Sequence, residues 1–176
     1  MAEQFATPPT RPLESYLELI ERILKEVLRA GRFELSFTIV KGTPGEDEPE
    51  TPELVVDFAG PDADLLLEKN GALLNALEYV VLRAARLEEE LFGRITFDSN
   101  DWRSLRAEEL KLTARIAAER VIETGDPFAL QPMSARERRI VHLALRDLPA
   151  VRTASEGAGA DRKVVIHSAS PPRRRR

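Results

Sequence analysis

Four arginines and a histidine gather in residues 133–147, whose sequence is MSARERRIVHLALRD. Arg138 and His142 are four residues apart, and this spacing places two side chains next to each other on one face of a helix. A guanidinium can donate two parallel hydrogen bonds to one phosphate, and an imidazole can donate to the same phosphate or the next one. This stretch therefore predicts an anion-binding helix.

The same helix carries two further arginines. At about 100° per residue, Arg139 and Arg146 fall within the same arc of roughly 100° as the pair above, whereas Glu137 and Asp147 project outside it. Like charges without acidic partners repel each other, and an external anion would offset that repulsion. Arg146 also has a purely structural interpretation, because a cation near a helix C-terminus is favoured by the helix dipole.

The rest of the chain offers little support for catalysis. Cysteine is absent, and His142 and His167 are the only histidines. Neither histidine belongs to a metal-binding motif, and no glycine-rich phosphate loop is present. We therefore expect no catalytic residues, no metal site and no cofactor, and we expect that the protein is not an enzyme.

Charge divides the chain into two unlike halves. Residues 1–98 carry 10 lysines and arginines against 20 aspartates and glutamates, whereas residues 99–176 carry 16 against 10. The first half is acidic and the second is basic, which favours an anionic partner for the second half. No apolar run reaches the length of about 20 residues needed to cross a bilayer, and no signal peptide is evident, so we expect a cytoplasmic protein without membrane insertion.

Hydrophobic periodicity predicts the elements that position these residues. In the first half we expect a helix over about 13–30 with Gly31 as its C-cap, strands over 33–40, 54–58 and 94–98, and a helix over about 72–89. A short helix precedes the helix over about 72–89, and the turn that connects these two helices is Glu68-Lys69-Asn70-Gly71. The two earlier strands are expected to pair antiparallel.

The sequence of the second half predicts two helices that cover a small sheet. The first helix has Asn100 or Asp101 as its N-cap and ends at Gly125, and the second begins with a capping box at Ser134. Two strands around a glycine-rich turn lie within 151–167. Arg162 and Lys163 flank the last strand and could extend a phosphate track, although exposed strand ends often carry lysine for solubility. Residues 1–12 and the basic tail 169–176 are expected to be disordered.

The element order of residues 13–98 resembles that of the bacterial-type (type II) KH domain. The segment LLLEKNGALLNALEYVV resembles the helix, Gly-x-x-Gly turn and second helix with which that domain clamps about four nucleotides. Glu68 departs from the pattern at the first glycine, where it adds bulk and a negative charge facing phosphate. Lys69 and Asn70 retain donors for weak backbone contact. The alternative is that the turn, which ends at Gly71, only connects two core helices.

Arg138-x-x-x-His142 resembles the signature of the R-three-H domain, a single-stranded nucleic-acid module. Its surroundings, LQPMSARERRIVHLALRDLPAVRTASEGAGADRKVVI, resemble the C-terminal part of the bacterial Jag (SpoIIIJ-associated) family, in which a KH domain precedes an R-three-H domain. The likeness spans roughly residues 13–168. It implies a cytoplasmic RNA-binding protein, often working with a small single-KH partner and influencing cell envelope growth or division. The N-terminal Jag domain of that family is expected to be missing.

These observations predict an α+β protein with a degenerate type II KH domain over 13–98 and an R-three-H domain over 99–168. The leading hypothesis is single-stranded RNA binding, with single-stranded DNA as an alternative ligand, in an RNA chaperone or post-transcriptional regulator. The predicted contacts are Arg138, His142, Arg139, Arg146, Arg162 and Lys163. The alternative is a protein-interaction adaptor whose acidic first half docks a partner KH protein, with RNA contact incidental.

Overall fold

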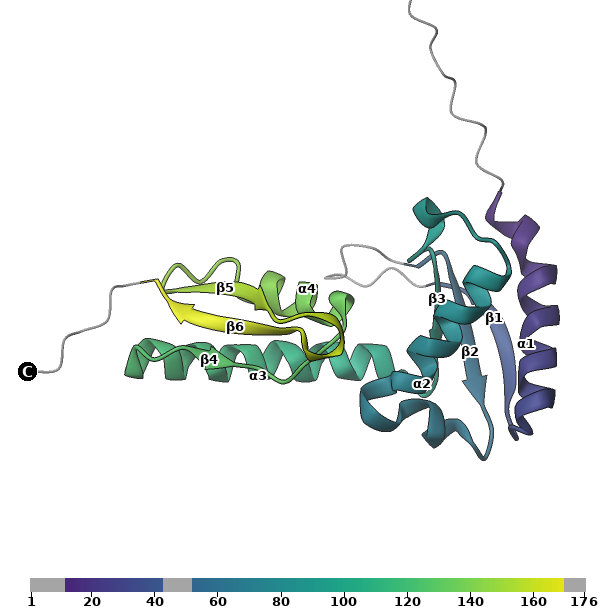
Figure 1. Ribbon diagram of the computed structural model, residues 1–176, viewed down its shortest axis with the longest axis horizontal. Helices are drawn as coiled ribbons and strands as arrows, with labels where there is room; N and C mark the ends of the chain where they lie inside the picture. The colour runs from purple at the N-terminus through teal and green to yellow at the C-terminus, as the bar shows by residue number, and fades with distance from the viewer. Residues whose placement is uncertain (1–11, 43–51, 170–176) are drawn as a thin grey trace, which may run out of the picture. The chain divides into compact units, whose positions relative to one another are not determined.

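A computed structural model describes residues 12–42 and 52–169 of the chain. The chain divides into two compact units, residues 1–102 and 103–176, each with its own hydrophobic core. Both units combine helices and strands, which confirms the predicted α+β class (Figure 1). The residues expected to be disordered at the two ends lie almost entirely outside the described ranges. No helix among the described residues is long and apolar enough to span a membrane.

The first unit has the predicted element order. It consists of the 3₁₀ helix η1 (Leu13–Tyr16), α1 (Leu17–Gly31), β1 (Ser36–Lys41), β2 (Leu54–Ala59), α2 (Ala63–Ala84), the 3₁₀ helix η2 (Glu89–Leu91) and β3 (Ile95–Asp98). β1 and β2 pair antiparallel, as expected, and β2 pairs parallel with β3. Helices α1 and α2 pack on this sheet in Figure 1.

Apolar periodicity accounts for the packing of the first unit. Ile20, Leu24 and Leu28 recur every four residues on α1 and all three are buried. In the sheet, Phe37 lies opposite Phe58, and their ring centroids are 6.0 Å apart. Alternate strand residues point to the same face, so these rings join the helical side chains in one core. The prediction that Gly31 is the C-cap of α1 was wrong: the helix continues through Gly31, and Arg32 follows it in the left-handed conformation with φ of 55°.

The predicted turn interrupts α2. Glu68 is extended, with φ −55° and ψ 151°, and Lys69, Asn70 and Gly71 then adopt left-handed conformations in succession. Three consecutive positive φ angles cannot continue a right-handed helix, so the chain turns sharply there. The second helical part ends at Ala84 rather than near residue 89.

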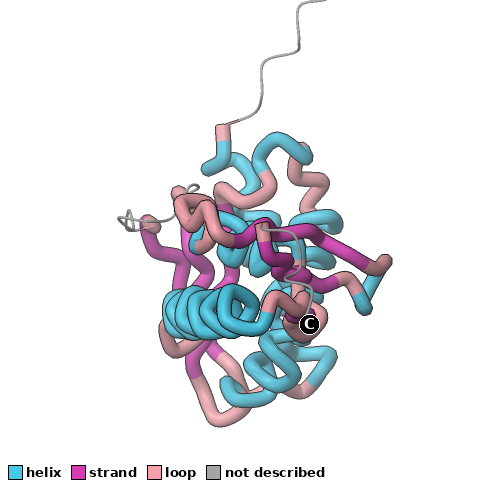
Figure 2. Tube along the Cα trace, turned by 90° about the vertical axis from the view of Figure 1, so that its left-hand side faces the viewer, coloured by secondary structure: helices cyan, strands magenta, loops and turns pink. Residues whose placement is uncertain are grey.

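The second unit is a three-stranded sheet with two helices. It contains α3 (Trp102–Thr124), β4 (Phe128–Ala129), α4 (Ala135–Ala144), β5 (Val151–Glu156), the 3₁₀ helix η3 (Gly159–Asp161) and β6 (Lys163–Ser168). The strand order is β4-β6-β5, and both pairings are antiparallel. Figure 2 distinguishes these strands from the helices along the chain trace. The predicted apolar centre, Val164–Ile166, is buried.

One local prediction for the second unit was wrong, and one strand was not predicted. The strand is β4, which forms where Phe128 and Ala129 pair with β6. α4 ends at Ala144, so Arg146 lies beyond the helix rather than on its face. The helical pattern of the sequence continues past this point, but Leu145 leaves the helical region with ψ near 1°.

Candidate nucleic-acid interface

The start of α4 is held by a capping box and an ion pair. The Ser134 hydroxyl accepts a hydrogen bond from the Glu137 amide at 3.3 Å, and the Glu137 carboxylate accepts one from the Ser134 amide at 2.8 Å, as predicted. The other Glu137 oxygen accepts from Arg106 Nε on α3, also at 2.8 Å. Since Arg106 neutralises it, Glu137 does not compete for the arginines that follow it.

Burial disfavours the charge of Arg106, but hydrogen bonds to Glu137 and Glu109 outweigh it and raise the pKa of the guanidinium. The pair joins residues far apart in sequence, and the side chains of Arg106 and Glu137 are only 14% and 10% exposed. Sequence reasoning missed it because the capping box already explained Glu137 and nothing local points to Arg106. The pair fixes α4 relative to α3, and so fixes where Arg138 begins.

Arg138 and His142 lie at the edge of the buried face of α4 rather than on its most exposed face. Each directly follows a residue of the buried face, Glu137 and Val141, and each is half-buried. One residue corresponds to about 100° of helix rotation, which turns their side chains toward the edge of the core. Neither side chain projects fully into solvent, and the structure places both on one side of the helix.

His142 connects α4 to β5. Its Nδ1 lies 2.6 Å from the Thr153 hydroxyl, and its Nε2 lies 2.9 Å from the Ser155 hydroxyl. A neutral imidazole donates from one nitrogen and accepts at the other, so both hydroxyls can be satisfied at once. Thr153 and Ser155 are the site residues that sequence reasoning missed, and the alternating Thr-x-Ser of β5 was the signal available.

Burial, together with the positive charge of Arg138, lowers the pKa of His142 below its ordinary value of 6.5. The ring is therefore neutral near pH 7, and both of its nitrogens already have partners. Its role is better described as positioning the helix on the strand than as supplying a positive charge. The positive charge at this edge of α4 comes from Arg138.

The pH dependence of stability tests this assignment. A histidine whose pKa is lower in the folded state binds fewer protons there than in the unfolded state. Its contribution to stability is therefore present above the unfolded pKa of about 6.5, and it is lost as pH falls from there through the lower pKa of the folded state. The free energy of unfolding should therefore fall between pH 7.5 and pH 5.5 by more in the native chain than in His142→Gln. Urea titrations at both pH values provide the measurement, and identical falls in the two proteins would contradict the lowered pKa.

The Nε–H donor of Arg138 is buried, and among the described residues no acceptor forms a hydrogen bond with it. A buried donor without a partner costs free energy comparable to that of a lost hydrogen bond, so a native structure rarely leaves one without reason. A bound anion beside α4 would supply the acceptor.

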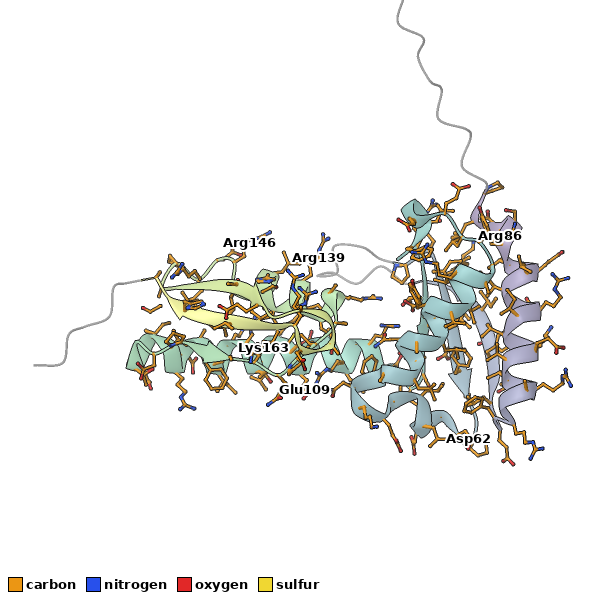
Figure 3. The ribbon with its side chains drawn as sticks, in the orientation of Figure 1. Asp62, Arg86, Glu109, Arg139, Arg146 and Lys163 are labelled. Carbon is orange, nitrogen blue, oxygen red and sulfur yellow. The ribbon has the colours of Figure 1, made fainter. Side chains whose placement is uncertain are left out.

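The other predicted contacts fall into two groups. Arg139 is exposed on α4, and Arg146 lies 3.4 Å from Asp147 in an exposed ion pair, which contradicts the expectation that no acidic partner is available to it. Such exposed pairs are weak, so a phosphate can compete for Arg146. Figure 3 shows Arg139 and Arg146 along the same edge of the unit, with Lys163 below them.

Lys163 lies across from Glu156, whereas Ser155 lies across from Val164. Successive residues of a strand point to opposite faces, so Lys163 and the His142 partner Ser155 are on opposite faces of the sheet. Arg162 is exposed just before β6. The structure therefore does not place Lys163 on the face of the sheet that carries Ser155.

The turn of the first unit exposes three of its four residues. Glu68, Lys69 and Asn70 are exposed, whereas Gly71 is buried beneath Trp102. A Cβ atom at position 71 would come within 2.6 Å of the indole ring. Glu68 has an ordinary extended conformation that any residue adopts, so glycine is not needed there for backbone reasons. Any effect of Glu68 on phosphate must come from its bulk and charge.

Comparison with known proteins bears on the second unit directly. Residues 108–168 match the R-three-H domain family, and this range includes α4, β5 and β6. This part of the chain is an R-three-H domain. The matched range contains Arg138 and His142, the two residues whose spacing resembles the signature of the domain.

The chain is also homologous to bacterial proteins named RNA-binding protein KhpB. It is 33% identical to KhpB of Clostridium symbiosum over 114 residues, which cover 65% of this chain and 51% of that protein. It is 34% identical to KhpB of Bacillus subtilis over 111 residues, covering 62% and 53%, and 28% identical to KhpB of Streptococcus pneumoniae over 148 residues, covering 84% and 44%. The chain thus spans about half the length of these relatives.

These findings confirm the predicted resemblance to the Jag family: the chain contains an R-three-H domain, and it is homologous to KhpB proteins. The relatives are named for RNA binding and not for a catalytic activity, in agreement with the prediction that the chain is not an enzyme. Among the described residues, no group of three or more histidine, aspartate or glutamate side chains could hold a metal ion.

Proposed function

We propose that the protein binds single-stranded RNA through the R-three-H unit, with α4 and β5 as the contact surface. The observation that carries this proposal is the buried Arg138 Nε without an acceptor among the described residues, beside the exposed Arg139. The nearest acidic residue of the helix, Glu137, is already bound to Arg106. The RNA-binding names of the KhpB relatives support RNA as the ligand, and single-stranded DNA is the alternative with the same backbone chemistry.

Contacts to phosphate should dominate over base recognition. Arginine forks match phosphate geometry, and stacking of bases needs exposed aromatic rings, of which the second unit offers few. Phe128, the aromatic residue nearest this surface in sequence, packs against the core and under Arg120. Affinity should therefore depend strongly on salt and weakly on sequence.

A comparison of the two units tests this proposal. A fragment of residues 103–176 should bind single-stranded RNA more tightly than residues 1–102, because the second unit is basic and carries the α4 surface. The logarithm of its affinity should fall with the logarithm of salt concentration with a slope of about −0.7 per phosphate contacted. Filter binding from low to high salt gives both values. Equal affinities of the two fragments would refute the assignment to the R-three-H unit.

We further propose that residues 13–98 form a type II KH domain whose turn has lost much of its RNA affinity. The element order and the left-handed turn at Lys69–Gly71 support the KH assignment. Glu68 places a carboxylate where the domain would bring phosphate close to its backbone, and Trp102 covers the turn at Gly71. The net charge of the first half adds a general repulsion of RNA.

Replacing Glu68 should recover part of that affinity. Glu68→Gly removes both the charge and the bulk, and RNA binding by residues 1–102 should strengthen by about 1 to 2 kcal/mol. The extended conformation at position 68 means that no helical residue is lost, so the stability cost is small. Titration of labelled RNA by fluorescence anisotropy gives the affinities.

Glu68→Gln is the matched control, because it removes the charge and keeps the size. A gain in both variants assigns the defect to electrostatics, and a gain in the glycine variant alone assigns it to space. If neither variant binds more tightly, the first unit lacks an RNA surface for reasons beyond this residue, and the adaptor function gains support.

The second candidate function is that adaptor, in which the first unit docks a small single-KH protein. Exposed apolar side chains on α2 favour it: Leu73, Tyr79 and Val80 are 37%, 58% and 55% exposed. A cytoplasmic role as an RNA chaperone or post-transcriptional regulator linked to cell envelope growth or division rests on the Jag resemblance. RNA crosslinking in cells, with Arg138→Ala as the comparison, separates direct RNA binding from recruitment by a partner.

A further inference from the structure

An exposed apolar stripe runs along the outer face of α3. Leu105, Leu112 and Ile116 are 66%, 60% and 58% exposed. Their spacing of seven and four residues aligns them within about 40° of arc on one side of the helix. The opposite side, which includes Leu110, Ala114 and Val121, is buried in the core of the second unit. The helix is therefore apolar on two faces, and its own unit covers only one.

The stripe repeats like the seam of a coiled coil. Glu109 lies within it, between Leu105 and Leu112, and points away from the sheet in Figure 3. The seven-residue repeat from Leu105 to Leu112, followed by Ile116, is typical of helices that pair along one side. Exposed charges of both signs line one border of this seam: Glu108, Arg115 and Glu119.

We propose that this stripe is a dimer interface in which α3 pairs antiparallel with α3 of a second copy of the chain. In the register that places Leu105 opposite Ile116 of the second copy, Glu108 of each chain lies beside Arg115 of the other. The charges on this border of one copy are thus complementary to those on the same border of the second copy, as a two-fold symmetric contact requires. Parallel pairing would instead place Glu109 against Glu109, and like charges at that position repel.

The chemistry of the stripe argues against nucleic acid as its occupant. Glu109, Glu119 and Glu123 share this face of α3 with the apolar residues, and phosphates would be repelled there. The Arg138 surface lies on a different helix, so dimerisation and RNA binding are separate properties. The dimer proposal does not rest on the proposed RNA-binding function.

Sedimentation velocity on the full chain tests the dimer. The native protein should show a concentration-dependent monomer–dimer equilibrium in the micromolar range. Leu112→Glu places a charge in the seam and should raise the dissociation constant at least about tenfold. Ile122→Glu is the matched control, because Ile122 is 47% exposed on the same helix but lies roughly 80° or more around it from the stripe. That variant should dimerise like the native chain.

A charge exchange identifies the register. Glu108→Arg should weaken the dimer, and the double variant Glu108→Arg/Arg115→Glu should restore it at least in part, since the pair then forms with reversed signs. Within its own chain, Glu108 bonds Lys111 at 2.8 Å and interacts electrostatically with Arg115. Both variants lose the Lys111 contact, and the dimer dissociation constant, rather than the stability of the chain, is the quantity that reports the intermolecular pair. A monomeric native chain, or a Leu112→Glu variant that dimerises normally while circular dichroism shows it folded, would overturn the proposal.

Discussion

Arg138→Ala is expected to weaken binding of single-stranded RNA by about 1 to 3 kcal/mol, which corresponds to roughly 5- to 150-fold. The loss follows from the position of the guanidinium, whose Nε is buried and has no acceptor among the described residues. In the proposed complex, a phosphate oxygen of the RNA accepts that hydrogen bond. Fluorescence anisotropy with a short single-stranded RNA measures the change. Circular dichroism should show an intact fold, because no described hydrogen bond to that Nε is removed.

Arg152→Ala is the matched control for charge. Arg152 is exposed on β5, and it lies on the opposite face of the sheet from Thr153. It should lose less than about 0.5 kcal/mol of RNA affinity. If Arg152→Ala and Arg138→Ala weaken binding equally, the protein attracts RNA by overall charge, and the α4 site is not specific.

Two further substitutions separate shape from charge at this site. Arg138→Lys keeps the charge but loses the planar fork, so it should recover only part of the affinity lost in Arg138→Ala. His142→Ala should reduce stability as well as affinity, because the ring links α4 to both hydroxyls of β5. A stable His142→Ala variant with lost RNA binding would instead indicate that the histidine contacts phosphate directly.

Gly71→Ala is expected to reduce the free energy of unfolding of the first unit by about 2 to 5 kcal/mol. Position 71 has φ of 67°, where a side chain costs about 1 to 2 kcal/mol. The added Cβ would also lie 2.6 Å from the Trp102 ring, and overpacking of this kind costs a further 1 to 3 kcal/mol or so. Trp102 is the only tryptophan, so its fluorescence during urea unfolding reports this contact.

Gly125→Ala separates the two causes. Gly125 has φ of 78°, and no atom lies within 4 Å of a Cβ built there. Only the backbone term applies, so the second unit should lose about 1 to 2 kcal/mol, measured by circular dichroism. Equal losses in the two variants would show that the indole ring moves aside easily and that Gly71 is needed for its conformation alone.

The elements of this protein could be predicted because their causes are local. Apolar residues at three- and four-residue spacing on α1, and alternating ones on β1 and β2, carry their own periodicity. The capping box at Ser134 and the left-handed turn ending at Gly71 depend on residues within a few positions of each other. The Arg138 and His142 pair was recognisable for the same reason, since its spacing is a property of one helix.

The surroundings of that pair depended on contacts between distant residues. His142 meets Thr153 and Ser155, Glu137 meets Arg106, and no local pattern in the sequence encodes either contact. Strand β4 exists only because it pairs with β6, and α4 ends before Arg146 although its helical pattern continues. Sequence therefore determined which side chains one helix presents, whereas the tertiary structure decided their charge state, burial and partners, because these depend on what packs against the helix.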